Sequence, residues 1–212
     1  MTDDERGLSR ASFLRAGLVA AAAVPLIAGA TSPTLARAAE GPLEPTPMCD
    51  DGDDPTPPQM EGPYFKPNSP QRSSLIQQGV TGTRLVVTGY VFSLSCTPVS
   101  RALLDFWQAD RNGNYDNVGY RLRGHQFTDA QGKFTLTTIV PGLYPGRTRH
   151  IHVKVQAPGR PILTTQLYFP GEPRNNTDAI FDPRLLMTVQ NVPNGRTATF
   201  DFVLNIPGEE SK

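Results

Sequence analysis

The chain has 212 residues, and its 20 Lys and Arg balance its 20 Asp and Glu, which gives a formal net charge of zero. It is long enough for one domain with additional segments, and without excess positive charge no nucleic-acid partner is expected. The 21 Pro and 19 Gly, with aromatic and β-branched residues in short bursts, predict a turn-rich β protein rather than a helical one.

Residues 1–38 are typical of an export signal rather than of folded structure. Three arginines at positions 6, 10 and 15 precede the apolar, alanine-rich run 16–30, and the small residues Ala36 and Ala38, two positions apart, predict a cleavage site. The apolar run is shorter than the roughly 20 residues that span a bilayer, so no stable membrane insertion is expected. A cytoplasmic N-terminal helix is the alternative interpretation.

The stretch 9–15 is similar to a twin-arginine motif whose second arginine is replaced by Ala11. The twin-arginine and general secretory routes therefore both stay open for an exported bacterial protein, periplasmic or extracellular. Cys49 and Cys96 are the two cysteines of the chain, and an oxidising compartment favours their pairing as a disulfide. Two unpaired thiols are the alternative.

Residues 39–78 are expected to form a flexible N-terminal arm. Its first part, 39–58, is rich in Pro and Asp and has no periodicity, and its acidic residues lack the spacing of an EF-hand calcium loop. The segment 61–72 is expected to fold back over the domain. The folded domain is predicted at 79–206, followed by a tail at 207–212.

About seven short strands with turns between them predict an all-β fold, a β-sandwich of mostly antiparallel strands with long loops. A turn at 129–132 is expected to make a hairpin, and a short helix is expected at 177–181 with Thr177 as its cap. The predicted strands span 85–92, 102–108, 133–139, 150–156, 161–169, 185–190 and 196–204.

Two of the three histidines, His150 and His152, occupy alternate positions of one predicted strand. Alternation puts both imidazoles on one face, close enough to share a metal ion, and puts Ile151 and Val153 on the other. A solvated edge or a hydrogen-bonded pair of histidines is the alternative, and the pattern alone does not choose a metal.

Two tyrosines come from turns near this strand. Tyr144 lies in the turn 141–146 just before it, and Tyr115 follows the turn-rich loop 110–114. A phenol has a pKa of about 10 and becomes a ligand only when a strongly Lewis-acidic ion displaces its proton. Among common ions, Fe(III) does this best.

Between residues 59 and 202 the chain resembles the intradiol ring-cleavage dioxygenases, the family of catechol and protocatechuate dioxygenases. A series of ordered blocks carries the resemblance, and their combination is specific although each block alone is weak. The blocks are 61–65, 104–110 with Gly113 and Tyr115, 128–134, 138–144, 150–152 and 164–167.

The resemblance implies an exported, non-haem Fe(III) enzyme. Its substrates would be O2 and a small aromatic diol, whose ring is cleaved between the two hydroxyl-bearing carbons to give a muconate-type diacid. The implied metal ligands are Tyr115, Tyr144, His150 and His152. The resemblance also makes Tyr144 the ligand that departs and takes a substrate proton.

By the same resemblance Arg147 is the cation that faces negative charge on the activated ring, and Gln166 is its polar partner. Alternatively, Arg147 caps a turn or pairs with Asp105, and Gln166 is an ordinary inward strand residue. Further alternatives concern other side chains: Tyr120 as a rival to Tyr115, His125 as a surface or second-layer histidine, Tyr64 as a packing or pocket-lining residue, and Arg149 as an outward charge or a determinant of substrate choice.

The loop between Tyr144 and His150 is shorter than in the cytoplasmic enzymes of this family, and no N-terminal helical dimerisation segment is visible. The chain therefore looks most like the short exported members, with a more open pocket whose substrate is not fixed. A homodimer is compatible with the sequence. Two other functions stay open: a secreted β-sandwich module that binds phenolics or carbohydrate without turnover, and a copper or zinc protein that uses His150 and His152.

Overall fold

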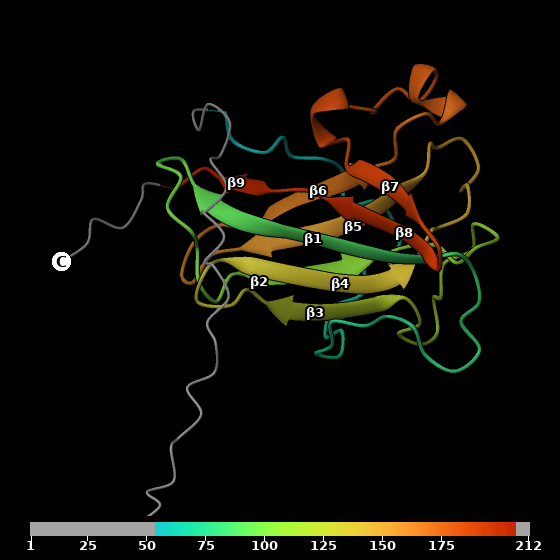
Figure 1. Cartoon of the computed structure of the whole chain (residues 1–212), viewed down its shortest axis with the longest axis horizontal. Coiled ribbons are helices and arrows are strands. Elements are labelled where there is room, and N and C mark those ends of the chain that lie inside the picture. Colours follow the sequence, from blue (N-terminus) through green and yellow to red (C-terminus); the bar gives the residue numbers. More distant parts are fainter. Residues whose placement is uncertain (1–53, 207–212) are drawn as a thin grey trace, which may run out of the picture. The chain divides into compact units, whose positions relative to one another are not determined.

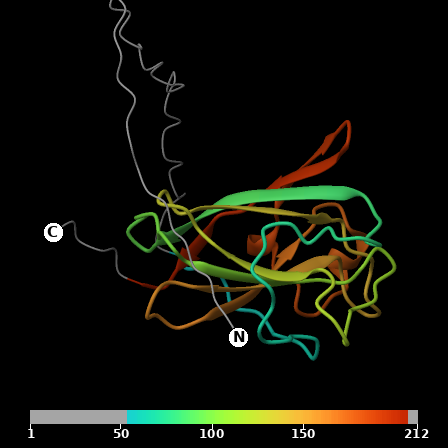
Figure 2. The same ribbon diagram turned by 90° about the horizontal axis from the view of Figure 1, so that it is seen from below.

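A computed structural model describes residues 54–206, which fold into two packed β-sheets (Figures 1 and 2). The described residues form nine strands and two short 3-10 helices. The elements are β1 (Arg84–Ser93), β2 (Leu103–Trp107), β3 (Arg123–Phe127), β4 (Lys133–Ile139), β5 (His150–Gln156), β6 (Leu163–Tyr168), η1 (Pro173–Asn176), η2 (Pro183–Leu185), β7 (Thr188–Val192), β8 (Gly195–Thr199) and β9 (Phe202–Leu204). None of the helices in this part of the chain is long and apolar enough to cross a membrane.

One sheet has the strand order β4-β1-β8-β7, with β9 also pairing with β1, and the other has the order β3-β2-β5-β6. The pairs β1–β8 and β1–β9 are parallel and the remaining pairs are antiparallel. The predicted all-β sandwich of mostly antiparallel strands is therefore confirmed.

The core lies between the two sheets. Alternate residues of β5, namely Ile151, Val153 and Val155, are fully buried in it, and burial of each such side chain contributes about 1.5–3 kcal/mol. At the end of β2, Gln108 joins the sheets, because its Nε2 donates to the Ile139 carbonyl at 2.9 Å and its Oε1 accepts from Thr138 at 2.8 Å. This contact fixes the end of β2 next to Trp107.

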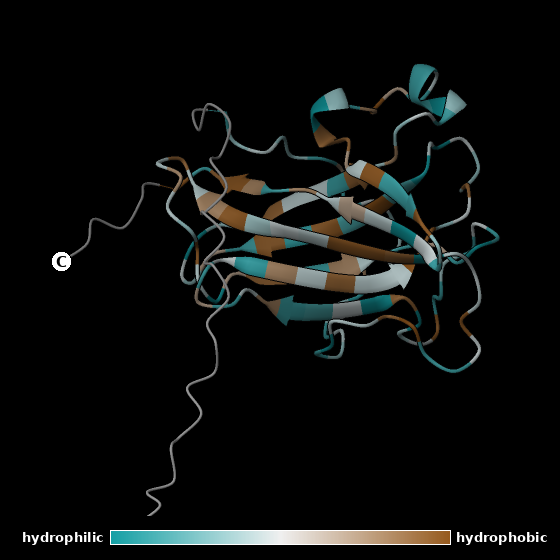
Figure 3. Ribbon diagram, in the orientation of Figure 1, coloured by the Kyte–Doolittle hydropathy of each residue, from teal (hydrophilic) through white to brown (hydrophobic). Residues whose placement is uncertain are grey.

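Four local predictions were wrong. The predicted single strand 196–204 is two strands, β8 and β9, which pair with successive parts of β1. β3 was missed because Arg123, His125 and Gln126 make it hydrophilic (Figure 3). The turn at 129–132 is present, but it joins β3 to β4 in the other sheet and so is not a hairpin. The predicted helix at 177–181 is absent, and Thr177 instead ends η1, with its N–H donating to the Arg174 carbonyl.

The outer face of the β3-β2-β5-β6 sheet is crossed by residues 59–65, here called the strap. The Gln59 amide donates to the Thr164 carbonyl at 2.8 Å, Glu61 pairs with Lys154, and Phe65 packs edge-on against Trp107. The segment 54–78, which we interpreted as part of a flexible arm, is thus held against the sandwich. The predicted signal, residues 39–53 with Cys49, and the tail lie outside the described residues, so the Cys49–Cys96 disulfide stays a prediction.

Candidate metal centre

The two histidines lie on the strap-covered face of β5, which runs between β2 and β6. In the registers of these pairs His152 is opposite both Trp107 and Gln166, and His150 is opposite Tyr168. Directly opposed residues point to the same face of a sheet, so these five side chains form one surface. The strap and neighbouring loops bury it, leaving His150 5% and His152 3% exposed.

The two imidazoles are oriented so that their Nε2 atoms face each other. These atoms lie 3.1 Å apart, while Nδ1 of His150 lies 2.6 Å from the Thr148 carbonyl and the ring of His152 stacks on Trp107. Donation by His150 Nδ1 leaves a lone pair on its Nε2. Burial lowers the pKa of His150 to about 4 and lowers that of His152 well below its usual value. Both rings are therefore neutral at pH 7.

Tyr115 reaches the histidines from the loop between β2 and β3, and its hydroxyl lies 3.2 Å from Nε2 of His150. This loop docks on the loop that carries Tyr144. Gly113 has a φ of +87°, and a Cβ at this position would lie 2.2 Å from the Leu143 carbonyl oxygen. The Gly142 amide also donates to the Asp110 carbonyl at 2.7 Å. Glycine at these positions is what lets the two tyrosine loops approach each other.

The hydroxyl of Tyr144 lies 2.9 Å from the hydroxyl of Tyr64 on the strap. Tyr64 also stacks on Tyr115, with ring centroids 4.5 Å apart, and the rings of Tyr115 and Tyr144 are 5.9 Å apart. The structure thus brings Tyr115 directly to the histidines and places Tyr144 beside Tyr115 with its hydroxyl on Tyr64. Tyr64 is more than a packing residue, and its place in the block 61–65 was the available signal.

The donor set fits a metal ion. Atoms bound to one ion at about 2.0–2.1 Å lie roughly 3 Å from each other, and Nε2 of His150 lies 3.2 Å from the Tyr115 oxygen and 3.1 Å from Nε2 of His152. Within residues 54–206, Nδ1 of His152 has no hydrogen-bond partner, while its Nε2 faces Nε2 of His150. Between residues 54 and 206 no group of three His, Cys, Asp or Glu side chains could hold a metal, so an ion here would need the phenols.

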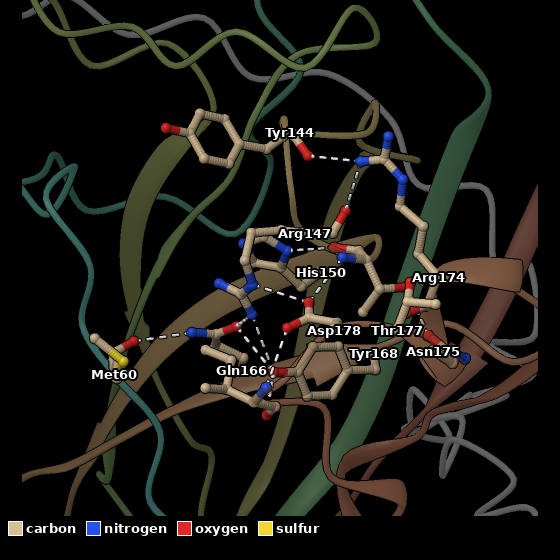
Figure 4. A network of polar contacts seen from close by, with 12 residues as sticks. Met60, Tyr144, Arg147, His150, Gln166, Tyr168, Arg174, Asn175, Thr177 and Asp178 are labelled. Atoms are coloured by element: carbon tan, nitrogen blue, oxygen red, sulfur yellow. Dashed lines mark hydrogen bonds and ion pairs between the residues drawn. The ribbon is translucent and has the colours of Figure 1, made fainter.

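Beside the histidines, Arg147 and Gln166 are in contact (Figure 4). An Nη2–H of Arg147 donates to Oε1 of Gln166 at 2.7 Å, and Nε2 of Gln166 donates to the Met60 carbonyl at 2.9 Å. Gln166 therefore lies on the histidine face and not in the core between the sheets. Arg147 pairs with Asp178 at 2.9 Å, while Asp105 accepts from Ser69, so the alternative pairing of Arg147 with Asp105 was wrong.

The other candidate side chains are engaged elsewhere. The Tyr120 hydroxyl donates to the Pro67 carbonyl at 2.9 Å, and Nδ1 of His125 lies 3.1 Å from the Ser69 hydroxyl on the far side of β2. Arg149 pairs with Glu172 at 2.6 Å and donates to the Pro141 carbonyl. Arg149 thus ties down the loop that carries Tyr144.

Arg123 and Asp178 were missed by sequence reasoning. The guanidinium of Arg123 is buried and donates to the carbonyls of Tyr64 and Asp116, which connects the strap to the Tyr115 loop. Burial lowers the pKa of Arg123. No sequence signal identifies a buried arginine in a hydrophilic strand, and Asp178 lies in a loop without periodicity.

Comparisons with known proteins show which family the chain is similar to. Residues 60–206 match the model of a family described as "Dioxygenase". The chain is 27% identical to a chlorocatechol 1,2-dioxygenase of Pseudomonas sp. (strain P51), covering 69% of each protein. It is 31% identical to catechol 1,2-dioxygenase 2 of Acinetobacter lwoffii over 61% of this chain, and spans only 56% of that relative's length.

Among solved structures, the dioxygenase domain of a dioxygenase carbohydrate-binding protein fusion from Streptomyces sp. SirexAA-E is 68% identical. It superimposes with a TM-score of 0.71 over 73% of this chain and 100% of that domain. The 3-chlorocatechol 1,2-dioxygenase of Rhodococcus opacus 1CP is 29% identical, with a TM-score of 0.65 over 71% of this chain and 72% of that one.

Proposed function

Because this chain belongs to the intradiol ring-cleavage dioxygenase family, we propose that it uses Fe(III) and O2 to cleave catechol-type aromatic diols. The ring would open between the two hydroxyl-bearing carbons and give a muconate-type diacid. One O2 adds to the diol and one carbon–carbon bond breaks, so no external reductant is needed. The observation that carries the proposal is the position of Nε2 of His150, which lies 3.2 Å from the Tyr115 hydroxyl and 3.1 Å from Nε2 of His152.

Tyr115, Tyr144, His150 and His152 would hold the ion. The imidazoles are neutral at pH 7, since burial lowers their pKa values, and the two phenols would bind as phenolates. Two phenolates and one hydroxide balance the charge of Fe(III), which suits a buried site where net charge is costly. When bound, the ferric ion supplies the Lewis acidity that makes a catecholate reactive towards O2.

The tyrosine pair would handle a substrate proton. A catechol has two protons to lose, and the phenolate oxygen of Tyr144 would accept one of them. Tyr64 supports this role because its hydroxyl lies 2.9 Å from that of Tyr144. A protonated Tyr144 released from the ion would keep a hydrogen-bond partner there, which lowers the cost of leaving.

Arg147 and Gln166 would stabilise charge on the substrate. Nη2 of the Arg147 guanidinium lies 2.7 Å from Oε1 of Gln166, which is opposite His152 in the register of β5 and β6. Negative charge that develops on the ring during the reaction would be stabilised by this fixed cation. Tyr168 would help to hold Gln166 in place, because its hydroxyl donates to Oε1 of Gln166 at 3.1 Å.

Export from a bacterial cell is part of this proposal and is supported by the pattern of residues 1–38. Oxygen uptake by protein reconstituted with Fe(III) tests the activity, with catechol, chlorocatechol, hydroxyquinol and protocatechuate as substrates. We expect uptake with at least one of them and, under ¹⁸O2, a diacid that carries both labelled atoms. A protein that binds these diols without consuming O2 would be the binding module instead. Activity restored by zinc or copper rather than iron would overturn the choice of metal.

A further inference from the structure

One short segment contacts residues 144–149, which carry Tyr144 and Arg147 and lead directly into His150 at the start of β5. Residues 172–178, which include η1, contact these residues at successive positions (Figure 4). Arg174 donates to the carbonyls of Tyr144 and Arg147 at 3.1 and 3.2 Å, and the Thr148 hydroxyl donates to Asn175 at 2.6 Å. We call residues 172–178 the brace.

Within the brace, Asp178 is the residue whose side chain contacts the guanidinium of Arg147. Its Oδ2 accepts from Nε of Arg147 at 2.9 Å and from the Thr148 amide at 2.8 Å, and its side chain is 2% exposed. Burial by itself raises the pKa of Asp178, but the bonds from Thr148, Ile180 and Arg147 outweigh it and leave the pKa below its usual value. The carboxylate is therefore charged and fully engaged at neutral pH.

Different nitrogens of the Arg147 guanidinium contact different partners. Nε donates to Asp178, while Nη2 donates to Gln166 and lies 3.3 Å from the Tyr168 hydroxyl. A guanidinium is planar and rigid, so a partner on one nitrogen restricts the directions of the others. Arginine has several rotatable bonds and would otherwise sample many positions.

We propose that Asp178 is a positioning residue that aims the guanidinium of Arg147 at Gln166 and the substrate. This inference rests on the proposed function, in which Arg147 faces the reacting ring. The negative charge of Asp178 by itself would weaken the positive potential of Arg147. If Asp178 acted only through its charge, removing that charge would raise kcat. If Asp178 positions Arg147, removing the charge lowers kcat.

The variant Asp178→Asn removes the charge and keeps the side-chain size. We expect its kcat to fall about 10- to 100-fold, the range typical when a group that orients a catalytic residue is lost. Iron content and the visible spectrum should stay those of the wild type, because none of the four implied ligands is changed. Asp182→Asn is the matched control, since Asp182 caps η2 and pairs with the exposed Arg184, and we expect its kcat within about twofold of wild type.

A double-mutant cycle with Arg147→Ala separates positioning from general destabilisation. If Asp178 acts through Arg147, Asp178→Asn should lower kcat in the wild-type background and change it little in the Arg147→Ala background. A crystal structure of metal-free Asp178→Asn should also show Nη2 of Arg147 displaced from Gln166.

Three outcomes would overturn the inference: equal losses in both backgrounds, an unchanged or higher kcat for Asp178→Asn, or an undisplaced Arg147. A wild-type protein without dioxygenase activity would instead contradict the proposed function. In that case the position of Arg147 in the variant structure still tests the role of Asp178.

Discussion

The hydroxyl oxygens of Tyr64 and Tyr144 lie 2.9 Å apart, although the two residues are 80 positions apart in the chain. Tyr64 comes from the strap and Tyr144 from the loop before β5, so the contact joins two elements that bury the histidines. Tyr64 is also stacked on Tyr115. This one side chain therefore touches both phenols that the proposed centre requires.

Replacing Tyr64 by Phe removes the hydroxyl and keeps the ring that stacks on Tyr115. We expect kcat to fall about tenfold, because a Tyr144 that leaves the ion loses a hydrogen bond worth roughly 1 kcal/mol or more. Iron binding should persist, since the implied ligands are intact. Steady-state kinetics beside an iron assay check this, and a kcat equal to that of wild type would show that Tyr64 serves packing alone.

Iron affinity should rise with pH across the range from pH 6 to pH 8. Burial raises the pKa of Tyr115, so this phenol is protonated in the metal-free protein at pH 7 and must release its proton when the ion binds. The imidazoles release none, because the pKa of His150 is lowered to about 4 and that of His152 is also well below neutral. A metal–chelator competition at pH 6, 7 and 8 measures this effect.

In the same competition the Tyr115→Phe variant should show a shallower pH dependence by about one proton. Tyr120→Phe, whose hydroxyl bonds to the Pro67 carbonyl, is the control and should keep the slope of the wild type. An affinity that is flat from pH 6 to 8 in the wild-type protein would argue against phenolate ligation.

The variant Gly113→Ala should disrupt the docking of the two tyrosine loops. A Cβ there would lie 2.2 Å from the Leu143 carbonyl oxygen. This oxygen belongs to the backbone and cannot move aside as the end of a flexible side chain could. We expect a loss of roughly 2 kcal/mol or more in unfolding free energy, together with weaker iron binding. Denaturant titration and the iron assay measure the two effects.

Gly159→Ala is the matched control for this variant. Gly159 has a φ of +67°, and a Cβ there would have no atom of residues 54–206 within 4 Å. It should therefore show only the cost of positive φ, about 1 kcal/mol, with unchanged iron binding. Equal losses in the two variants would mean that loop docking contributes nothing beyond backbone conformation.

Most of the sandwich could be predicted from alternation of apolar residues. The strand at Lys133–Ile139 and the histidine strand were predicted with the observed bounds because their alternate residues enter one core. β3 could not be predicted this way, because its side chains are mostly hydrophilic and the segment beside it comes from far away in the chain. Gln71 forms a parallel β-bridge with His125, and the Arg72 amide donates to the His125 carbonyl. Local sequence contains no trace of such a distant backbone partner.

The residues of the site also fall into those that local sequence predicts and those that it does not. His150 and His152 are placed by strand periodicity, and both phenols by turns that the sequence marks with glycine. Asp178 and Tyr64 act through partners about 30 and 80 positions away, so their roles became visible only once the chain was folded.

The visible absorption spectrum of the iron-loaded protein tests the proposed centre most directly, with wild type measured beside Tyr115→Phe, Tyr144→Phe and the control Tyr120→Phe. A ferric ion bound by phenolates absorbs visible light through charge transfer from ligand to metal. We expect a visible band in the wild type and in Tyr120→Phe that is shifted or weakened in each of the other two variants. A colourless iron-loaded protein, or a band that neither ligand variant alters, would contradict the assignment.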